Sequence, residues 1–81
     1  MDPNKENKSK KVIDDILKNR GFDSHKVISQ TGDVLLVAYG YRKHKLSELI
    51  KHDYGSKTSE SVLIDGEVSF EEFINKLKKD N

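Results

Sequence analysis

The sequence predicts a single small α+β domain, in which a three-stranded sheet packs with three helices. The chain has 81 residues, of which 33% are hydrophobic, and this length suits one domain with a modest core. Apolar residues recur at helical spacing in several segments. Residues 33–41 form a continuous apolar run, which is typical of a strand buried on both faces. The expected element order is therefore α-β-β-α-β-α over residues 9–81.

Residues 1–8 are polar and are expected to form a disordered tail. Residues 9–20 have the pattern of an amphipathic helix, with four apolar side chains on one side: Val12, Ile13, Ile16 and Leu17. Gly21 suits the left-handed conformation that ends a helix, and Phe22 can fold back onto the last turn. The first helix is therefore expected to end just before Gly21.

Two strands are expected at residues 26–30 and 33–41, joined by a hairpin turn at Thr31-Gly32. Successive side chains of a strand point to opposite faces. One face of the second strand carries large apolar residues: Leu35, Val37, Tyr39 and Tyr41. The other face carries smaller residues that would seat a helix closely: Val34, Leu36, Ala38 and Gly40. We expect this strand to lie in the middle of the sheet.

A second helix is expected at residues 44–53, because Leu46, Leu49 and Ile50 have helical spacing and Gly55 follows them. Residues 55–60 are polar and are expected to form a loop. Residues 61–65 combine β-branched and apolar side chains, which favours a third strand.

Residues 65–73 look like the second half of an EF-hand calcium loop and its exiting helix. With Gly66 at the sixth loop position, Glu72 falls on the twelfth, where such a loop has its bidentate ligand. The third position then falls on Leu63, which has no side-chain oxygen, whereas Ca²⁺ takes at least six oxygen ligands. We therefore expect no calcium site here.

A helix cap explains the same residues. Ser69 and Glu72 form a capping box, and Val68 and Phe73 stand at the positions of a hydrophobic staple. The expected helix over residues 69–79 has an apolar stripe at i, i+3, i+4 and i+7: Phe70, Phe73, Ile74 and Leu77. The sequence therefore predicts a third helix that starts at this cap.

Composition excludes several classes of protein. The chain has no cysteine, which rules out disulfides and thiolate metal sites and favours a reducing compartment. No apolar run reaches the length of a membrane span, and the polar N-terminus lacks the apolar core of a signal peptide. A cytoplasmic location is expected. The net charge of +1 favours no class of partner.

No catalytic motif is evident. His44 and His52 would lie two helical turns apart, too far to share a metal, and both are expected to be exposed. A helix ending at Gly21, followed by a strand and by Asp33 before an apolar strand, resembles the opening of restriction-endonuclease-like nucleases. That family places Glu/Asp-x-Lys on the next strand, but residues 39–45 have no carboxylate before the lysines. We therefore expect a non-enzymatic protein without a cofactor, and Asp33 as a turn residue.

The first functional hypothesis is protein–protein binding by a small regulator, adaptor or inhibitor. If the helices pack on the small face of the central strand, its large face needs another cover. A partner protein or a second copy of the chain, as a homodimer, would then contact these residues: Leu35, Val37, Tyr39 and Tyr41. If the helices divide between the two faces, nothing is left uncovered.

The second hypothesis is nucleic-acid binding through the basic and aromatic segment 39–52. Basic side chains can neutralise phosphates, and a tyrosine can stack on a base. The candidate residues are Tyr41, Arg42, Lys43, His44, Lys45 and Lys51. Against this hypothesis, the chain as a whole lacks the excess of positive charge that is typical of nucleic-acid-binding domains.

Overall fold

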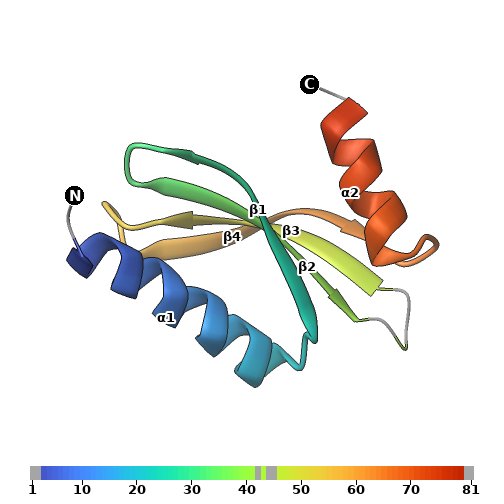
Figure 1. The fold of residues 1–81 in the computed structure, drawn as a ribbon, viewed down its shortest axis with the longest axis horizontal. Helices are drawn as coiled ribbons and strands as arrows, with labels where there is room; N and C mark the ends of the chain where they lie inside the picture. Colours follow the sequence, from blue (N-terminus) through green and yellow to red (C-terminus); the bar gives the residue numbers. More distant parts are fainter. Residues whose placement is uncertain (1–2, 42, 44–45, 80–81) are drawn as a thin grey trace.

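The computed structural model, which describes residues 3–41, 43 and 46–79, places a helix on each face of a four-stranded antiparallel sheet (Figure 1). Neighbouring strands in the chain are neighbours in the sheet, in the order β1-β2-β3-β4. The elements are α1 (Pro3–Arg20), β1 (Ser24–Thr31), β2 (Val34–Tyr41), β3 (Leu46–Asp53), β4 (Thr58–Asp65) and α2 (Phe70–Lys79).

The helix α1 ends where the sequence indicates. Gly21 has a φ of 76°, the left-handed conformation that ends a helix at little cost for glycine. Phe22 is buried and packs in the same cluster as Leu17. At its start α1 differs from expectation. The sequence predicts a disordered tail over residues 1–8, but the helix already begins at Pro3, and residues 1–2 lie outside the described residues.

The hairpin between β1 and β2 is confirmed. Thr31 pairs with Val34, and Gly32 between them has a φ of 59°. Tight hairpin turns require such left-handed residues, so glycine suits this position. Asp33 lies in the turn, as expected, and its backbone carbonyl accepts a hydrogen bond from the Tyr54 amide at 2.8 Å.

The expected second helix is wrong. Residues 46–53 form β3, which pairs along its whole length with β2. In the described residues, the expected three-stranded sheet with three helices is therefore replaced by four strands and two helices. Leu49 packs on the α2 side and Ile50 on the α1 side, so a strand covered on both faces also accounts for their spacing. The third strand expected at residues 61–65 corresponds to β4, which is longer and already begins at Thr58.

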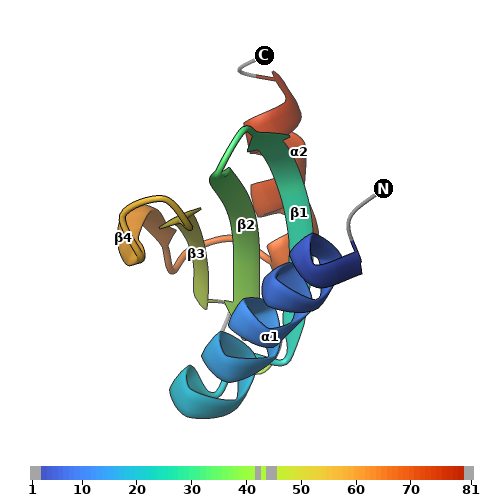
Figure 2. The same cartoon turned by 90° about the vertical axis from the view of Figure 1, so that its left-hand side faces the viewer.

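The core has two layers, one on each face of the sheet. The α1 layer contains Ile13, Phe22, Leu35, Val37, Tyr39 and Ile50. The α2 layer contains Ala38, Leu49, Phe73 and Ile74, with Val68 packed against it at the staple position. The two helices thus divide between the faces of the sheet, as Figures 1 and 2 show. The small face of β2 does seat a helix closely, because a Cβ on Gly40 would overlap the Phe70 ring.

Both helices lie over the β1 end of the sheet. α1 packs on β1 and β2, and α2 packs on β1, β2 and β3. Figure 2 shows β4 at the other side of the sheet, away from α2. Helices therefore pack on both faces of the sheet at β1, although six of the eight β1 residues are exposed, whereas neither helix packs extensively on β4 in the described residues.

Candidate functional site

The strand β4 forms the far edge of the sheet and is hydrogen-bonded to β3. Its first half is polar, and its second half carries three large apolar residues in a row. Leu63 lies opposite Leu49, while Ser61 lies opposite Ile50. Val62 is therefore an extra residue in the ladder, a β-bulge, which bends the strand and increases its twist.

The three apolar residues of β4 are largely exposed. Val62, Leu63 and Ile64 are 53%, 47% and 61% exposed, and we refer to them as the β4 apolar segment. Leu63 points to the same face of the sheet as Leu49, and Ile64 points to the opposite face. Apolar side chains thus stand on both faces beside a backbone edge. Contiguous exposed apolar groups are typical of interaction surfaces.

Charged side chains near the β4 apolar segment form ion pairs within the chain. Lys51 Nζ lies 3.5 Å from a carboxylate oxygen of Glu60, and Lys76 Nζ lies 3.2 Å from one of Asp65. These pairs reduce the net field on this side of the sheet. Association through β4 would therefore depend on apolar contacts and backbone hydrogen bonds more than on charge.

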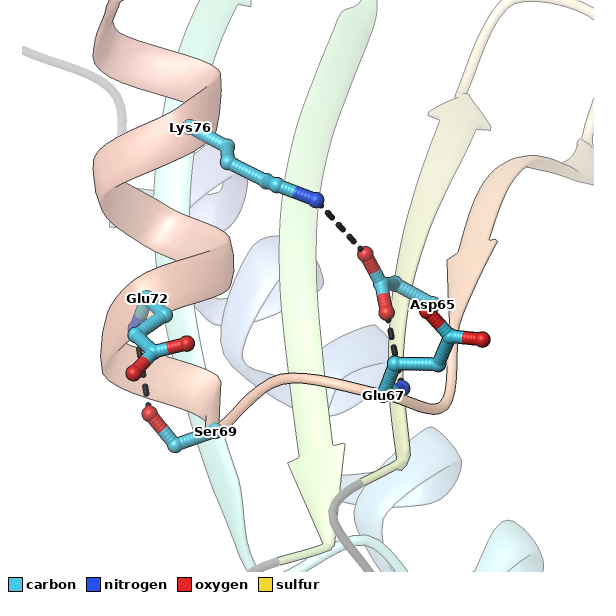
Figure 3. Close-up of polar contacts among 5 residues, drawn as sticks. All are labelled: Asp65, Glu67, Ser69, Glu72 and Lys76. Carbon is cyan, nitrogen blue, oxygen red and sulfur yellow. Dashed lines mark hydrogen bonds and ion pairs between the residues drawn. The ribbon is translucent and has the colours of Figure 1, made fainter.

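Figure 3 shows the polar contacts between the end of β4 and α2, where the ion pair between Asp65 and Lys76 joins the two elements. Asp65 accepts hydrogen bonds from the Glu67 amide at 2.9 Å and from Lys76 Nζ at 3.2 Å. The Glu67 bond, and next the Lys76 bond, hold the pKa of the Asp65 carboxyl below its ordinary value. The Ser69 hydroxyl accepts a hydrogen bond from the Glu72 amide at 3.3 Å, which confirms the predicted helix cap.

A chain of side-chain hydrogen bonds crosses β2, β3 and β4. The Tyr39 hydroxyl lies 2.8 Å from Nε2 of His52, and Nδ1 of His52 lies 2.8 Å from the Ser59 hydroxyl. Tyr39 and His52 are 0% and 1% exposed, so the expectation of an exposed helical His52 is wrong. Burial raises the pKa of Tyr39 and lowers the pKa of His52. At neutral pH both groups are therefore uncharged.

The residues expected to contact a partner lie under α1. Leu35, Val37 and Tyr39 are at most 1% exposed, and Tyr41 is half-buried beside Phe22, with ring centroids 4.6 Å apart. The premise that the helices leave this face uncovered is wrong, because α1 covers it. Contact of these four residues with a partner stays a prediction, but their geometry no longer supports it.

The residues of the nucleic-acid hypothesis are not brought together in the described part of the chain. Tyr41 packs against the core, and Lys51 pairs with Glu60. Lys43 is exposed. Three other candidates, Arg42, His44 and Lys45, lie outside the described residues.

No family model, curated protein or solved structure matches this chain. Within the described ranges, no helix is long and apolar enough to cross a membrane. Among those residues there is also no cluster of three or more metal-ligating side chains. Functional inference therefore depends on the fold and on its surfaces.

Sequence reasoning did not find the β4 apolar segment as a surface. Val62, Leu63 and Ile64 are recognisable as a strand, but an uninterrupted apolar run usually indicates a buried one. Their exposure follows from the place of β4 in the sheet. The polar first half of β4 does not by itself indicate an edge, because the interior strand β3 also carries several polar residues.

Proposed function

We propose that this protein acts by binding an extended segment of another protein, which adds as a strand along β4. The observation that carries the proposal is the exposure of Val62, Leu63 and Ile64 on an edge strand over which neither helix packs extensively in the described residues. An edge strand presents unpaired N–H and C=O groups that can pair with another chain. In strand addition, backbone hydrogen bonds supply affinity and alternate side chains supply specificity.

The size of the surface favours a peptide-like segment as the occupant. β4 has eight residues, whereas a stable interface between globular proteins buries about 800 Å² on each partner. A single strand offers less than that area. We therefore favour a reversible complex with one extended segment, which suits a regulator, adaptor or inhibitor better than a permanent subunit.

A second copy of this chain is a less favourable occupant. Two β4 strands pairing antiparallel about Val62 would bring both β-bulges to the same place, and a bulge disrupts the ladder where it occurs. A regular strand from another protein has only one bulge to accommodate. Sedimentation velocity, which measures self-association, distinguishes a homodimer from the proposed complex with a peptide segment.

The opposite edge of the sheet provides an internal comparison. α1 and α2 each pack on β1, although six of its eight residues are exposed. Val27 is the one large apolar residue among the exposed residues of β1, at 44% exposure. The other exposed residues of β1 are polar. Both edge strands carry a bulge, β1 between Val27 and Ser29 and β4 at Val62, so the two edges differ in their exposed apolar side chains, one in β1 against three in β4. We therefore assign binding to β4 and not to β1.

A non-enzymatic role and a cytoplasmic location are part of the same proposal. The absence of cysteine in the sequence is compatible with a reducing compartment. The hydrogen-bond chain from the buried Tyr39 and His52 to the exposed Ser59 is the arrangement closest to catalytic machinery in the described residues. Nδ1 of His52 donates its proton to the Ser59 oxygen. His52 therefore cannot accept the Ser59 hydroxyl proton, and Ser59 has no base beside it.

Selection from a library of displayed peptides tests the proposal. Peptides selected on the wild-type protein should be extended and apolar at alternate positions, and they should shift the backbone amide NMR signals of β4. The double variant Leu63→Lys/Ile64→Lys should bind them at least about tenfold more weakly, because both faces of the edge gain a charge. Its circular dichroism should stay that of the wild type, since both side chains are exposed.

The matched control is Val27→Lys, which changes an exposed apolar residue on the other edge and should leave peptide affinity unchanged. Equal affinity of the peptides for the wild type and for the β4 double variant would refute the proposal. Sedimentation velocity over a range of concentrations measures self-association. A dimer that the β4 double variant abolishes would replace the peptide by a second copy as the occupant.

A further inference from the structure

A cavity of about 330 Å³ opens between the middle of α1 and the turn that joins β3 to β4. This volume is at the lower end of the range for small-molecule sites. The lining residues are Lys11, Val12, His52, Asp53, Tyr54, Lys57, Thr58 and Ser59. The Val12 side chain, the Tyr54 ring and the stems of the two lysines give the cavity apolar walls. It is separate from the β4 apolar segment, none of whose residues lines it.

The hydrogen-bond chain behind the cavity determines which group Ser59 presents. Tyr39 keeps its proton, and within the described residues the only partner at its hydroxyl is Nε2 of His52. The Tyr39 hydroxyl therefore donates to Nε2. His52 is uncharged and has one ring proton, so that proton lies on Nδ1 and is donated to the Ser59 oxygen. The hydroxyl proton of Ser59 is then available to a ligand.

This proton arrangement argues against nucleophilic catalysis at Ser59. A histidine that activates a serine must accept the hydroxyl proton, and here Nδ1 already carries one. The opposite tautomer is disfavoured because it would leave the buried Tyr39 proton without an acceptor. The chain therefore presents a fixed hydrogen-bond donor to the cavity.

Two ammonium groups accompany this donor. Lys11 on α1 and Lys57 in the β3–β4 turn both line the cavity, and neither forms an ion pair with another described residue. Among the described residues, Asp53 is the one acidic residue that lines the cavity, and it accepts hydrogen bonds from the Gly55 and Ser56 amides at 2.9 and 3.3 Å. The Asp53 carboxylate is thus hydrogen-bonded to amides of the β3–β4 turn. Lys57 has a φ of 57°, which is unusual for a residue other than glycine.

We propose that this cavity binds a small molecule that has an apolar body and a carboxylate. The apolar walls would cover the body, and Ser59, Lys11 and Lys57 would contact the carboxylate. The proposal does not depend on the binding of a strand to β4.

An NMR titration of the full chain with four probes tests it. Hexanoate carries the proposed groups, hexanol lacks the charge, hexylammonium reverses it, and inorganic phosphate lacks the apolar body. Hexanoate should shift the backbone amides of Lys11, Val12, Thr58 and Ser59 saturably, with a Kd at least about tenfold below those of the other three probes. Tighter binding of phosphate than of hexanoate would overturn the carboxylate assignment, and equal binding of hexylammonium would overturn the charge assignment.

Variants locate the site. Ser59→Ala should weaken hexanoate binding about tenfold, because a hydrogen bond to a charged group is lost. Lys57→Gln should weaken it about threefold, as expected for an exposed charge, and this exposed substitution should leave the fold intact. The control Ser61→Ala changes an exposed hydroxyl on the same strand outside the cavity and should have no effect. Equal losses in Ser59→Ala and Ser61→Ala, or no saturable shift with hexanoate, would refute the proposal.

Discussion

Replacing Tyr39 by phenylalanine should destabilise the protein by about 1–3 kcal/mol. The ring would keep its place, stacked on Phe22 with centroids 5.3 Å apart, so little apolar contact is lost. The change removes the hydroxyl that lies 2.8 Å from Nε2 of His52. Both residues are at most 1% exposed, so water cannot replace the donor. The cost is that of an unsatisfied buried acceptor.

Urea unfolding and thermal unfolding measure this loss. For a domain of this size, each kcal/mol lowers Tm by about 4–8 °C, so the effect is well within reach of either method. The double variant Tyr39→Phe/His52→Leu should lose less than the sum of the two single variants, because it leaves no unpaired acceptor.

Nitrogen-15 NMR of the His52 ring tests the proton positions directly. In the wild type, Nδ1 should carry the proton and Nε2 should be the acceptor. A protonated Nε2 in the wild type would refute the reasoning, and so would unchanged stability in Tyr39→Phe. Either result would also remove the argument that Ser59 presents its proton to the cavity.

Three other predictions follow from particular contacts. Gly40→Ala should lower the free energy of unfolding in urea by about 1–3 kcal/mol, because the added Cβ would lie no more than 3.0 Å from three side-chain atoms of Phe70. Recovery of stability in combination with Phe70→Leu would support this cause, and a Gly40→Ala variant that is more stable than the wild type would contradict it. Ser69→Ala should cost about 1 kcal/mol through loss of the α2 cap, and an unchanged urea midpoint would exclude that role. Acid should destabilise the fold, because the pKa of His52 lies below its ordinary value of 6.5. As the pH falls below about 6.5, the unfolded chain binds a proton that the folded chain does not, so stability falls until the folded pKa is passed. His52→Gln should reduce this pH dependence of the unfolding free energy, whereas His25→Gln should keep it.

Residues 46–53 show why part of the fold was not predictable from local patterns. Leu46, Leu49 and Ile50 fit a helical stripe, and nothing within this segment distinguishes the stripe from a strand covered on both faces. Residues 46–53 become a strand because of β2, an apolar strand whose backbone must hydrogen-bond on both edges. β3 supplies the second edge, with Val34 opposite Asp53 and Tyr41 opposite Leu46.

The buried polar residues of β3 were missed for a related reason. Glu48 is 3% exposed and its carboxylate lies 3.1 Å from Arg20 at the end of α1. His52 is satisfied by Tyr39 on one side and Ser59 on the other. A charged or polar group can be buried when it is paired, but these partners come from other elements. Local sequence reasoning places such residues on the solvent face.

The sequence by itself determined the features that depend on neighbours along the chain. Gly21 ends α1, Gly32 makes the first hairpin, Ser69 caps α2, and the two apolar faces of β2 place it inside the sheet. Each is a matter of local backbone conformation or side-chain alternation. Only the tertiary structure decided that residues 46–53 pair as a strand, that His52 is buried, and that the β4 apolar segment is exposed. These depend on which elements cover which face, and an apolar side chain has the same local pattern whether or not a helix lies over it.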